Sequence, residues 1–231
     1  HVAAGGVTLP PGADSVDTLV PAPASPDVHR VDAASAAECE RIVGLVEAHL
    51  AAGGALTTDR HGGFPTTDIP ISHVPGLAEL AGPLLQSSIA PRICEAYGLP
   101  PGSLVAHDLF VVVYSAEQGG QRALATHQDE SHFSFNLLLT PASEFDGGGT
   151  WFEHLDATIT LEQGQLCCHP GELRHRGVEI TRGRRMLLVG FLQDRRRALF
   201  DRELPAGLQS VVGQEAGRRL RSEWEGHNDA G

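Results

Sequence analysis

The second half of the chain is a series of short apolar runs separated by turns that contain glycine or proline. Their aromatic and β-branched content is typical of strands. The runs are Leu104–Tyr114, Phe133–Leu139, Thr150–His154, Thr158–Leu161, Gln165–Cys168, Gly177–Ile180 and Arg185–Leu192. Short strands at this spacing indicate an all-β sandwich or barrel and argue against repeated βαβ units.

Helices are expected before these strands. Ser35 and Glu38 form a capping-box pattern, and an apolar stripe at helical spacing runs from Ile42 to Leu50 before Gly53. The fold class predicted is therefore mainly β with flanking helices. The other elements expected are a short strand over 28–31, a loop over 55–75 and a second helix over 77–97.

The chain is expected to form one domain behind an extended arm. Residues 1–27 are rich in proline, alanine, glycine and serine and show little periodicity, as is typical of an arm. The 231-residue length suits one sizeable core. Within 28–231 we expect helical support over 32–100, a β core over 101–195 and a C-terminal helix over 205–225.

The net charge and the hydropathy of the chain argue against two kinds of partner, nucleic acids and membranes. The formal net charge of −12 argues against a nucleic-acid partner, which usually meets a basic surface. No apolar run is long enough to span a membrane, so no membrane association is expected. The first residues show no signal-peptide pattern, so a soluble, cytoplasmic protein is the default expectation.

The four cysteines predict neither a zinc site nor a disulfide framework. Their spacing matches no zinc motif. Free cysteine is among the most buried residue types, so buried, reduced thiols are expected. On a strand, adjacent Cys167 and Cys168 would point to opposite faces.

A metal site is suggested by three residues. His127 and Asp129 are separated by one residue, so on an extended segment their side chains share a face. With His175 they would make a facial triad of two histidines and one carboxylate, which suits non-haem Fe(II) and leaves open positions. His169 competes with His175 for the third position, although its Pro-Gly context is that of a turn.

A dicarboxylate co-substrate would also need an arginine, because a guanidinium binds a carboxylate with two parallel hydrogen bonds. Arg185 lies on one face of the last strand and Arg184 on the other. From alternation alone, either side chain could point inward.

The region 110–191 resembles the 2-oxoglutarate- and iron-dependent dioxygenases of the prolyl and lysyl hydroxylase type. It is most similar to the lysyl hydroxylase catalytic domain. The resemblance rests on several runs in the right order and at plausible spacing. These are Phe110-Val-Val-Val-Tyr114, His127-Gln-Asp-Glu-Ser-His-Phe-Ser-Phe-Asn136, Phe145-Asp-Gly-Gly-Gly-Thr-Trp-Phe152, His169-Pro-Gly171, His175-x-Gly177 and Gly183-x-Arg185.

The resemblance implies a double-stranded β-helix, or jelly roll, and a set of site residues. Iron would be held by His127, Asp129 and His175, and 2-oxoglutarate by Arg185. The hydroxyl group of Tyr114 and the amide of Asn136 would also face the co-substrate. Molecular oxygen would be consumed, and ascorbate would support the reaction in assays. The implied activity is hydroxylation of a C–H bond, with succinate and carbon dioxide as co-products.

The substrate expected is a peptide or protein, because the resembled hydroxylases act on peptide side chains. It would lie across the loops 55–75 and 115–126, where Arg122, Arg174 and Arg176 would give a basic rim and favour an acidic or neutral peptide. The chain lacks residues that lysyl hydroxylases have between the Pro-Gly turn and the ligand histidine, so lysyl specificity does not follow. Hydroxylation of a free amino acid or small molecule is the alternative, as is a metal-binding jelly-roll sensor without turnover.

Overall fold

The computed structural model describes residues 27–195. The C-terminal helix expected over 205–225 lies outside these residues, as does the arm expected over 1–27 except for Asp27. No helix among residues 27–195 is long and apolar enough to cross a membrane.

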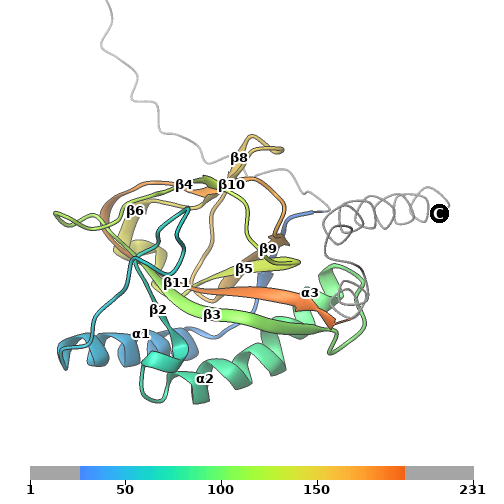
Figure 1. The fold of residues 1–231 in the computed structure, drawn as a ribbon, viewed down its shortest axis with the longest axis horizontal. Coiled ribbons are helices and arrows are strands. Elements are labelled where there is room, and N and C mark those ends of the chain that lie inside the picture. Colours follow the sequence, from blue (N-terminus) through green and yellow to red (C-terminus); the bar gives the residue numbers. More distant parts are fainter. Residues whose placement is uncertain (1–26, 196–231) are drawn as a thin grey trace, which may run out of the picture.

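Two antiparallel sheets face each other and form the double-stranded β-helix that the sequence predicts (Figure 1). The larger sheet has the strand order β1-β9-β5-β11-β3-β2, and β6 pairs with β11 beside this path. Its strands are β1 (His29–Asp32), β2 (Asp68–Pro70), β3 (Leu104–Ser115), β5 (Phe133–Leu138), β6 (Phe145–Gly147), β9 (Gln165–Pro170) and β11 (Ile180–Asp194). The smaller sheet, in the order β4-β10-β7-β8, consists of β4 (Leu124–His127), β10 (His175–Gly177), β7 (Thr150–Phe152) and β8 (Ala157–Ile159).

The long ladder between β3 and β11 separates the two sides of the larger sheet. Because side chains alternate along a strand, one face of β11 carries Met186 and Leu188 into the core under the helices. The other face carries Arg185, Leu187 and Val189 toward the smaller sheet. Cys167 and Cys168 on β9 divide between the two cores in the same way, as predicted.

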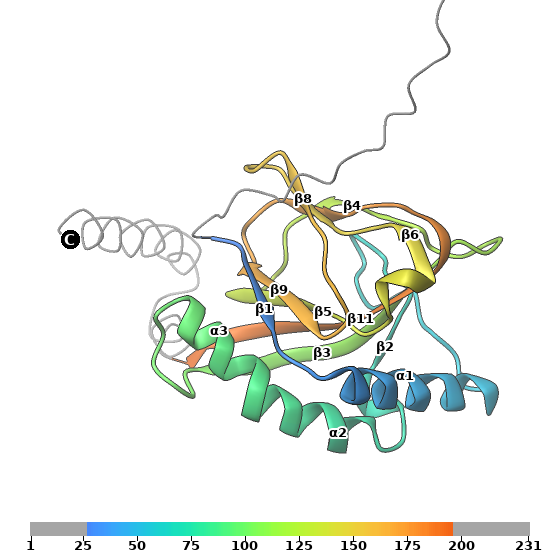
Figure 2. The ribbon, with the colours of Figure 1, turned by 180° about the vertical axis from the view of Figure 1, so that it is seen from behind.

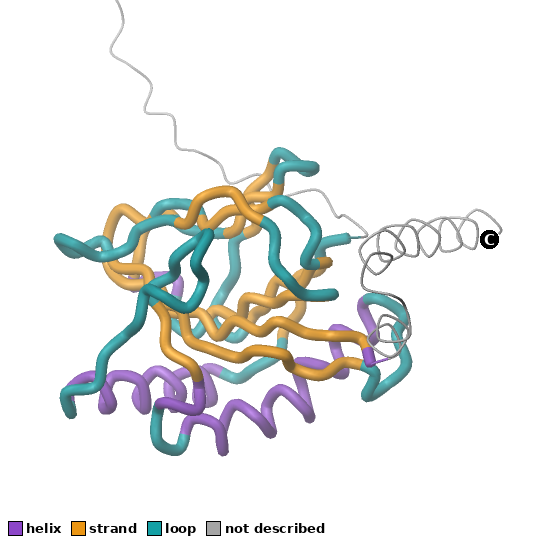
Figure 3. Tube along the Cα trace, viewed as in Figure 1, coloured by secondary structure: helices purple, strands orange, loops and turns teal. Residues whose placement is uncertain are grey.

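The helices cover the outer face of the larger sheet, on the side away from the smaller sheet (Figures 2 and 3). Helix α1 (Ala36–Ala51) begins at Ser35, which forms the predicted capping box with Glu38. The second helical region is continuous over α2 (Leu77–Leu84), the π-helical turn η2 (Leu85–Ile89) and α3 (Ala90–Ala96). Its apolar side packs with α1 into the outer core.

Two expectations differ from the structure. The segment 55–75 was expected to be a loop, but it contains β2 and the 3₁₀ turn η1 (Ile71–His73). The strand expected over Gly177–Ile180 is wrong, because β10 ends at Gly177 and β11 starts at Ile180. Val178 and Glu179 between them bond to the turn 147–149, through Val178 N to Gly149 O (3.1 Å) and Gly148 N to Glu179 O (2.8 Å), where the chain crosses between sheets.

Candidate active site

A cavity of about 490 Å³ lies between the two sheets. Its volume is in the range of ligand-binding sites. The inner faces of β3 and β11 line it, together with residues around β4, residues of β10 and the segment 60–66. The sequence analysis singled out six residues for the site. The larger sheet contributes Tyr114, Asn136 and Arg185. The smaller sheet contributes His127 and His175, and Asp129 lies in the loop after β4.

His127 and His175 face each other across the smaller sheet. They are direct partners in the β4–β10 register, and their ring centroids are 4.3 Å apart. Asp129 joins them: its Oδ1 lies 3.4 Å from His127 Nε2 and its Oδ2 lies 3.7 Å from His175 Nε2. One ligand atom from each residue lies within 4.8 Å of the other two. The structure thus brings together the two histidines and the carboxylate of the predicted triad.

The hydrogen bonds of the two imidazoles leave the correct nitrogen for a metal ion. His127 Nδ1 lies 2.8 Å from Ala125 O, and His175 Nδ1 lies 2.9 Å from Leu173 O. A carbonyl oxygen only accepts, so each Nδ1 carries the hydrogen and each Nε2 keeps its lone pair. This is the support that metal-bound histidines usually have. The donor set therefore fits a divalent metal ion.

The electrostatics of His175 and Asp129 favour these protonation states. At His127 burial lowers the pKa, but the interaction with Asp129 outweighs it and raises the pKa above its ordinary value. Burial lowers the pKa of His175 to about 3, so this ring is neutral at physiological pH. Burial opposes ionisation of Asp129, but the neighbouring His127 and His175 hold the pKa of the carboxyl group far below its ordinary value. A neutral imidazole beside an ionised carboxylate is the state in which both groups bind metal.

His169 lies beside this group but is not part of it. Its ring centroid is 4.4 Å from that of His175, and the residue is fully buried. Its Nδ1 lies 2.9 Å from Pro170 O, and its buried Nε2 has no hydrogen-bond partner among residues 27–195. Burial lowers the pKa of His169. The compact ligand group contains His175, as the sequence analysis preferred, and does not contain His169.

Arg185 and Arg184 are separated by the alternation of β11. The Arg185 side chain lines the cavity, although the residue is only 2% exposed, and no ion pair joins it to a carboxylate within the described part of the chain. Burial lowers the pKa of Arg185. Arg184 points the other way and pairs with Glu47 on α1. The cavity thus contains a buried cation whose natural partner would be an anionic ligand.

Tyr114 and Asn136 also line the cavity. Tyr114 is opposite Arg185 in the β3–β11 register, and the guanidinium carbon lies 5.5 Å from its ring centroid. Asn136 on β5 is opposite Val189 of β11. Val189 follows Leu187 on the inner face of β11. These three polar groups line the same cavity, where they can orient a small polar ligand.

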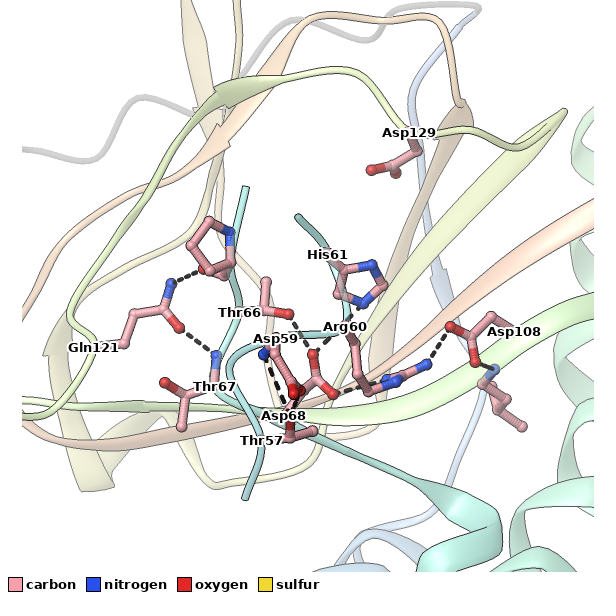
Figure 4. A network of polar contacts seen from close by, with 12 residues as sticks. Thr57, Asp59, Arg60, His61, Thr66, Thr67, Asp68, Asp108, Gln121 and Asp129 are labelled. Carbon is pink, nitrogen blue, oxygen red and sulfur yellow. Dashed lines mark hydrogen bonds and ion pairs between the residues drawn. The ribbon is translucent and has the colours of Figure 1, made fainter. Parts of the chain in front are cut away.

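The sequence analysis missed the wall opposite the triad. It placed Arg60, His61 and Asp68 in a loop and gave them no role. In the structure Arg60 and His61 line the cavity, and the buried Asp68 holds Arg60 Nη1 at 2.7 Å (Figure 4). Phe64 from the same segment stacks on His127, with ring centroids 5.3 Å apart. An Arg-His pair before two glycines was the available signal, but it does not specify the partners.

The three arginines of the predicted basic rim are engaged in contacts of their own. Arg174 pairs with Glu153 at 2.9 Å, Arg176 lies over the Trp151 ring at 4.4 Å, and Arg122 donates to Ala116 O at 2.7 Å. None of these three arginines lines the cavity. The lining contains instead the carboxylates of Asp108 and Glu130, so the preference for an acidic peptide loses its basis.

The two predicted mouth loops contribute unequally. Several residues of the segment 60–66 line the cavity, whereas Leu124 is the lining residue of the segment 115–126. Gln121 ties the two segments together: its Oε1 accepts from Thr67 N at 2.5 Å, and its Nε2 donates to Pro65 O at 3.1 Å (Figure 4). The second loop therefore mainly supports the first.

A double-stranded β-helix with this triad and a buried arginine in one cavity defines a class of protein, the 2-oxoglutarate- and Fe(II)-dependent oxygenases. Solved structures of this class share the fold. A prolyl-4-hydroxylase from Pseudomonas putida has a TM-score of 0.53 at 16% identity, covering 72% of this chain and 92% of that one. The epimerase SnoN from nogalamycin biosynthesis has a TM-score of 0.54 at 15% identity, covering 73% and 77%.

Sequence comparison shows which members of this class the chain resembles. No family model matches the chain. The procollagen-lysine,2-oxoglutarate 5-dioxygenase of Drosophila melanogaster is 30% identical over 180 residues, which is 72% of this chain and 24% of the relative. The chain is thus similar in sequence to the lysyl hydroxylases and in fold to a prolyl hydroxylase, both 2-oxoglutarate- and Fe(II)-dependent dioxygenases. It spans about a quarter of the length of the curated relatives that it matches.

Proposed function

We propose that this chain is a 2-oxoglutarate- and Fe(II)-dependent dioxygenase that hydroxylates a C–H bond of a peptidyl side chain, of prolyl or lysyl type. Succinate and carbon dioxide would be the co-products. The observation that carries the proposal is the presence, in one cavity, of the ligand group His127, Asp129 and His175 and of the buried cation Arg185.

Each residue has a defined task in this proposal. The two Nε2 atoms and the Asp129 carboxylate would hold Fe(II) on one face and leave the cavity side open. Arg185 would bind the distal carboxylate of 2-oxoglutarate, with Tyr114 and Asn136 beside it. Fe(II) and 2-oxoglutarate, with molecular oxygen, supply the oxidising chemistry that protein side chains lack. Ascorbate is expected to sustain the reaction in assays.

Phe64 and the strand residues around the site give the cavity apolar surface, which a bound substrate would close off from water. The Phe64 ring packs on His127, and Val112, Leu187 and Val189 add apolar side chains to the lining. Exclusion of water strengthens the interaction of Arg185 with a bound carboxylate. It also protects a reactive centre from side reactions.

Succinate formation tests the oxygenase part of the proposal. Purified protein, Fe(II), 2-oxoglutarate and ascorbate are incubated with and without a panel of peptides and free amino acids. Succinate and a single-oxygen mass increase on a peptide are expected together. No succinate under any condition, with metal bound, would contradict the proposal and favour a metal-binding jelly roll without turnover.

A small-molecule substrate is the second candidate. The epimerase SnoN shares the fold, so a double-stranded β-helix alone does not decide the reaction. Oxygen addition to a free amino acid, with no peptide modified, would favour this candidate. The expected absence of a nucleic-acid partner and the cytoplasmic location stay predictions.

A further inference from the structure

The segment between Thr57 and Asp68 is a closed loop that lines the cavity and is joined to strand β3 through β2. Its two ends bond to each other through Thr57 N to Asp68 O (2.8 Å) and Asp68 N to Thr57 O (3.0 Å). Strand β2, which begins at Asp68, pairs with the centre of β3, where Asp68 is opposite Val112. Compact loops with joined ends commonly carry function, because their side chains are held in fixed positions.

Asp68 organises the side chains of this loop. Its carboxylate is fully buried and accepts from Arg60 Nη1 at 2.7 Å and from the Thr66 hydroxyl group. Arg60 extends the contact to Asp108 on β3, at 2.5 Å (Figure 4). A buried carboxylate with several donors is costly to disturb, so the loop has one preferred arrangement.

His61 is held between this carboxylate and the cavity. Its ring packs against Phe110 and Phe191, with centroids 5.0 and 5.8 Å away. Its Nε2 lies 3.5 Å from Asp68 Oδ2, is shielded from solvent and has no hydrogen-bond partner among the described residues. Figure 4 shows the imidazole between Asp68 and Asp129, with one nitrogen toward Asp68 and the other turned away from it.

The Asp68 carboxylate makes no hydrogen bond to His61 Nε2, but its charge, 3.5 Å away, favours the tautomer with the hydrogen on Nε2. In a neutral ring the other nitrogen, Nδ1, is then an acceptor. His61 lines the same cavity as Asp129 and His127.

A peptide that enters this cavity must satisfy its backbone N–H groups. On the wall formed by the loop, Phe110 and Phe191 offer no acceptor, and Asp108 is already bonded to Arg60 and to Leu109 N. We infer that His61, oriented by Asp68, is a substrate-positioning residue whose Nδ1 accepts a hydrogen bond from a backbone N–H of the peptide. This inference rests on the proposed function, because it assumes a peptidyl substrate.

Binding without turnover tests the inference. The probes are acetylated, amidated pentapeptides with proline or lysine at the centre. Each is paired with analogues in which one backbone amide at a time is replaced by an ester, which removes one N–H. Binding to the anaerobic complex of the protein with Fe(II) and 2-oxoglutarate is measured by calorimetry. The proteins compared are wild type, His61→Phe, His61→Asn and His61→Gln.

The variants separate hydrogen bonding from packing. Phenylalanine keeps the ring contacts but has no acceptor, glutamine extends its amide toward Asp68, and asparagine places an oxygen near the position of Nδ1. We expect His61→Phe and His61→Gln to weaken peptide binding about tenfold, and His61→Asn to recover most of this loss. One ester analogue should bind wild type about tenfold more weakly and show no further loss in His61→Phe.

A matched substitution controls for general effects. His73 is exposed on η1, outside the cavity, so His73→Phe should bind the peptides as wild type does. Metal content and the 2-oxoglutarate dissociation constant should stay within about twofold of wild type in His61→Phe, because Arg185 and the triad remain. Parallel loss of metal or 2-oxoglutarate binding would assign His61 a structural role and overturn the inference.

Two further outcomes overturn it, and each is distinct from failure of the proposed function. In the first, His61→Phe binds every peptide as tightly as wild type. In the second, wild type forms succinate but binds no peptide of the panel, so there is no peptide N–H that could donate a hydrogen bond to His61. Failure of the proposed function itself is recognised separately, by wild type that binds metal and forms no succinate.

Discussion

Arg185 and Tyr114 are direct partners across the β11–β3 ladder, and both side chains enter the same cavity. The guanidinium carbon lies 5.5 Å from the tyrosine ring centroid, a distance at which a cation is attracted to an aromatic face. This contact holds the arginine in place without an opposing carboxylate. The strand register therefore prepares a buried cation for an anionic ligand.

Replacement of this cation should weaken the co-substrate selectively. Arg185→Ala should raise the KM for 2-oxoglutarate about 100-fold, because a carboxylate loses a charge-assisted, two-point contact. Arg184→Ala is the matched control: its side chain pairs with Glu47 outside the cavity, so the KM should change less than about twofold. Succinate formation over a range of 2-oxoglutarate concentrations measures both. Equal effects in the two variants would contradict the assignment.

Gly177 should be sensitive to a single methyl group. A Cβ atom added there would lie 2.6 Å from the Tyr114 hydroxyl oxygen and 3.2 Å from its Cζ atom, so the ring would have to move away from Arg185. Gly177→Ala should therefore raise the KM for 2-oxoglutarate about tenfold. The same assay checks this expectation.

Gly44→Ala serves as the control for this change. Gly44 is an exposed residue within α1, and an added Cβ would meet no atom within 4 Å. The substitution should leave the KM unchanged and raise the free energy of unfolding by about 0.5–1 kcal/mol, because alanine favours a helix over glycine. An unchanged KM in Gly177→Ala would show that Tyr114 does not act beside Arg185.

Much of the site was predictable because it depends on local periodicity. The two-residue repeat of a strand places Arg185 with Leu187 and Val189 on one face, and Arg184 on the other, whatever the rest of the fold does. The same repeat brings His127 and Asp129 together. His175 is distant from these two residues in the sequence. Its place beside them was indicated by the order of the motifs in the resembled family.

The wall around Asp68 was not predictable for the opposite reason. Strand β2 has three residues and ends in Pro70, a residue that weakens any strand prediction. Arg60 forms an ion pair with Asp108, which lies in a segment far from it in the chain. The error over Arg174 has the same origin, because its ion pair with Glu153 depends on the pairing of β7 with β10. Propensity and motif carry no information on such contacts.

The ligand assignment can be tested by comparing neighbouring histidines. His175→Ala should lose bound Fe(II) and all succinate formation, because a chelate of three ligands fails when one is removed. His169→Asn should keep both, since His169 lies outside the compact ligand group. Metal content by atomic emission, measured with turnover, separates lost binding from lost catalysis. Metal bound to His175→Ala and absent from His169→Asn would reverse the assignment.

The cysteines should be unreactive in the folded protein. All four are buried and free, as predicted. Burial raises the pKa of Cys39 to about 11 and that of Cys168 to about 12, and burial also raises the pKa of Cys167. The thiolate is the reactive form, so at pH 8 a thiol reagent should label none of these three until denaturant is added. Rapid labelling of the native protein would contradict their burial.

The same raised values predict a loss of stability at high pH. Unfolded thiols ionise near pH 9, whereas folded Cys39 and Cys168 keep their protons to about 11 and 12. The folded state therefore binds more protons between these values, and their stabilising contribution is complete below pH 9 and is lost as the pH rises through 11 to 12. Urea unfolding at pH 8 and pH 10 should show a lower midpoint at pH 10. A Cys39→Ala, Cys168→Ala variant should show a smaller decrease over the same interval, and an equal decrease would assign the alkaline effect to other groups.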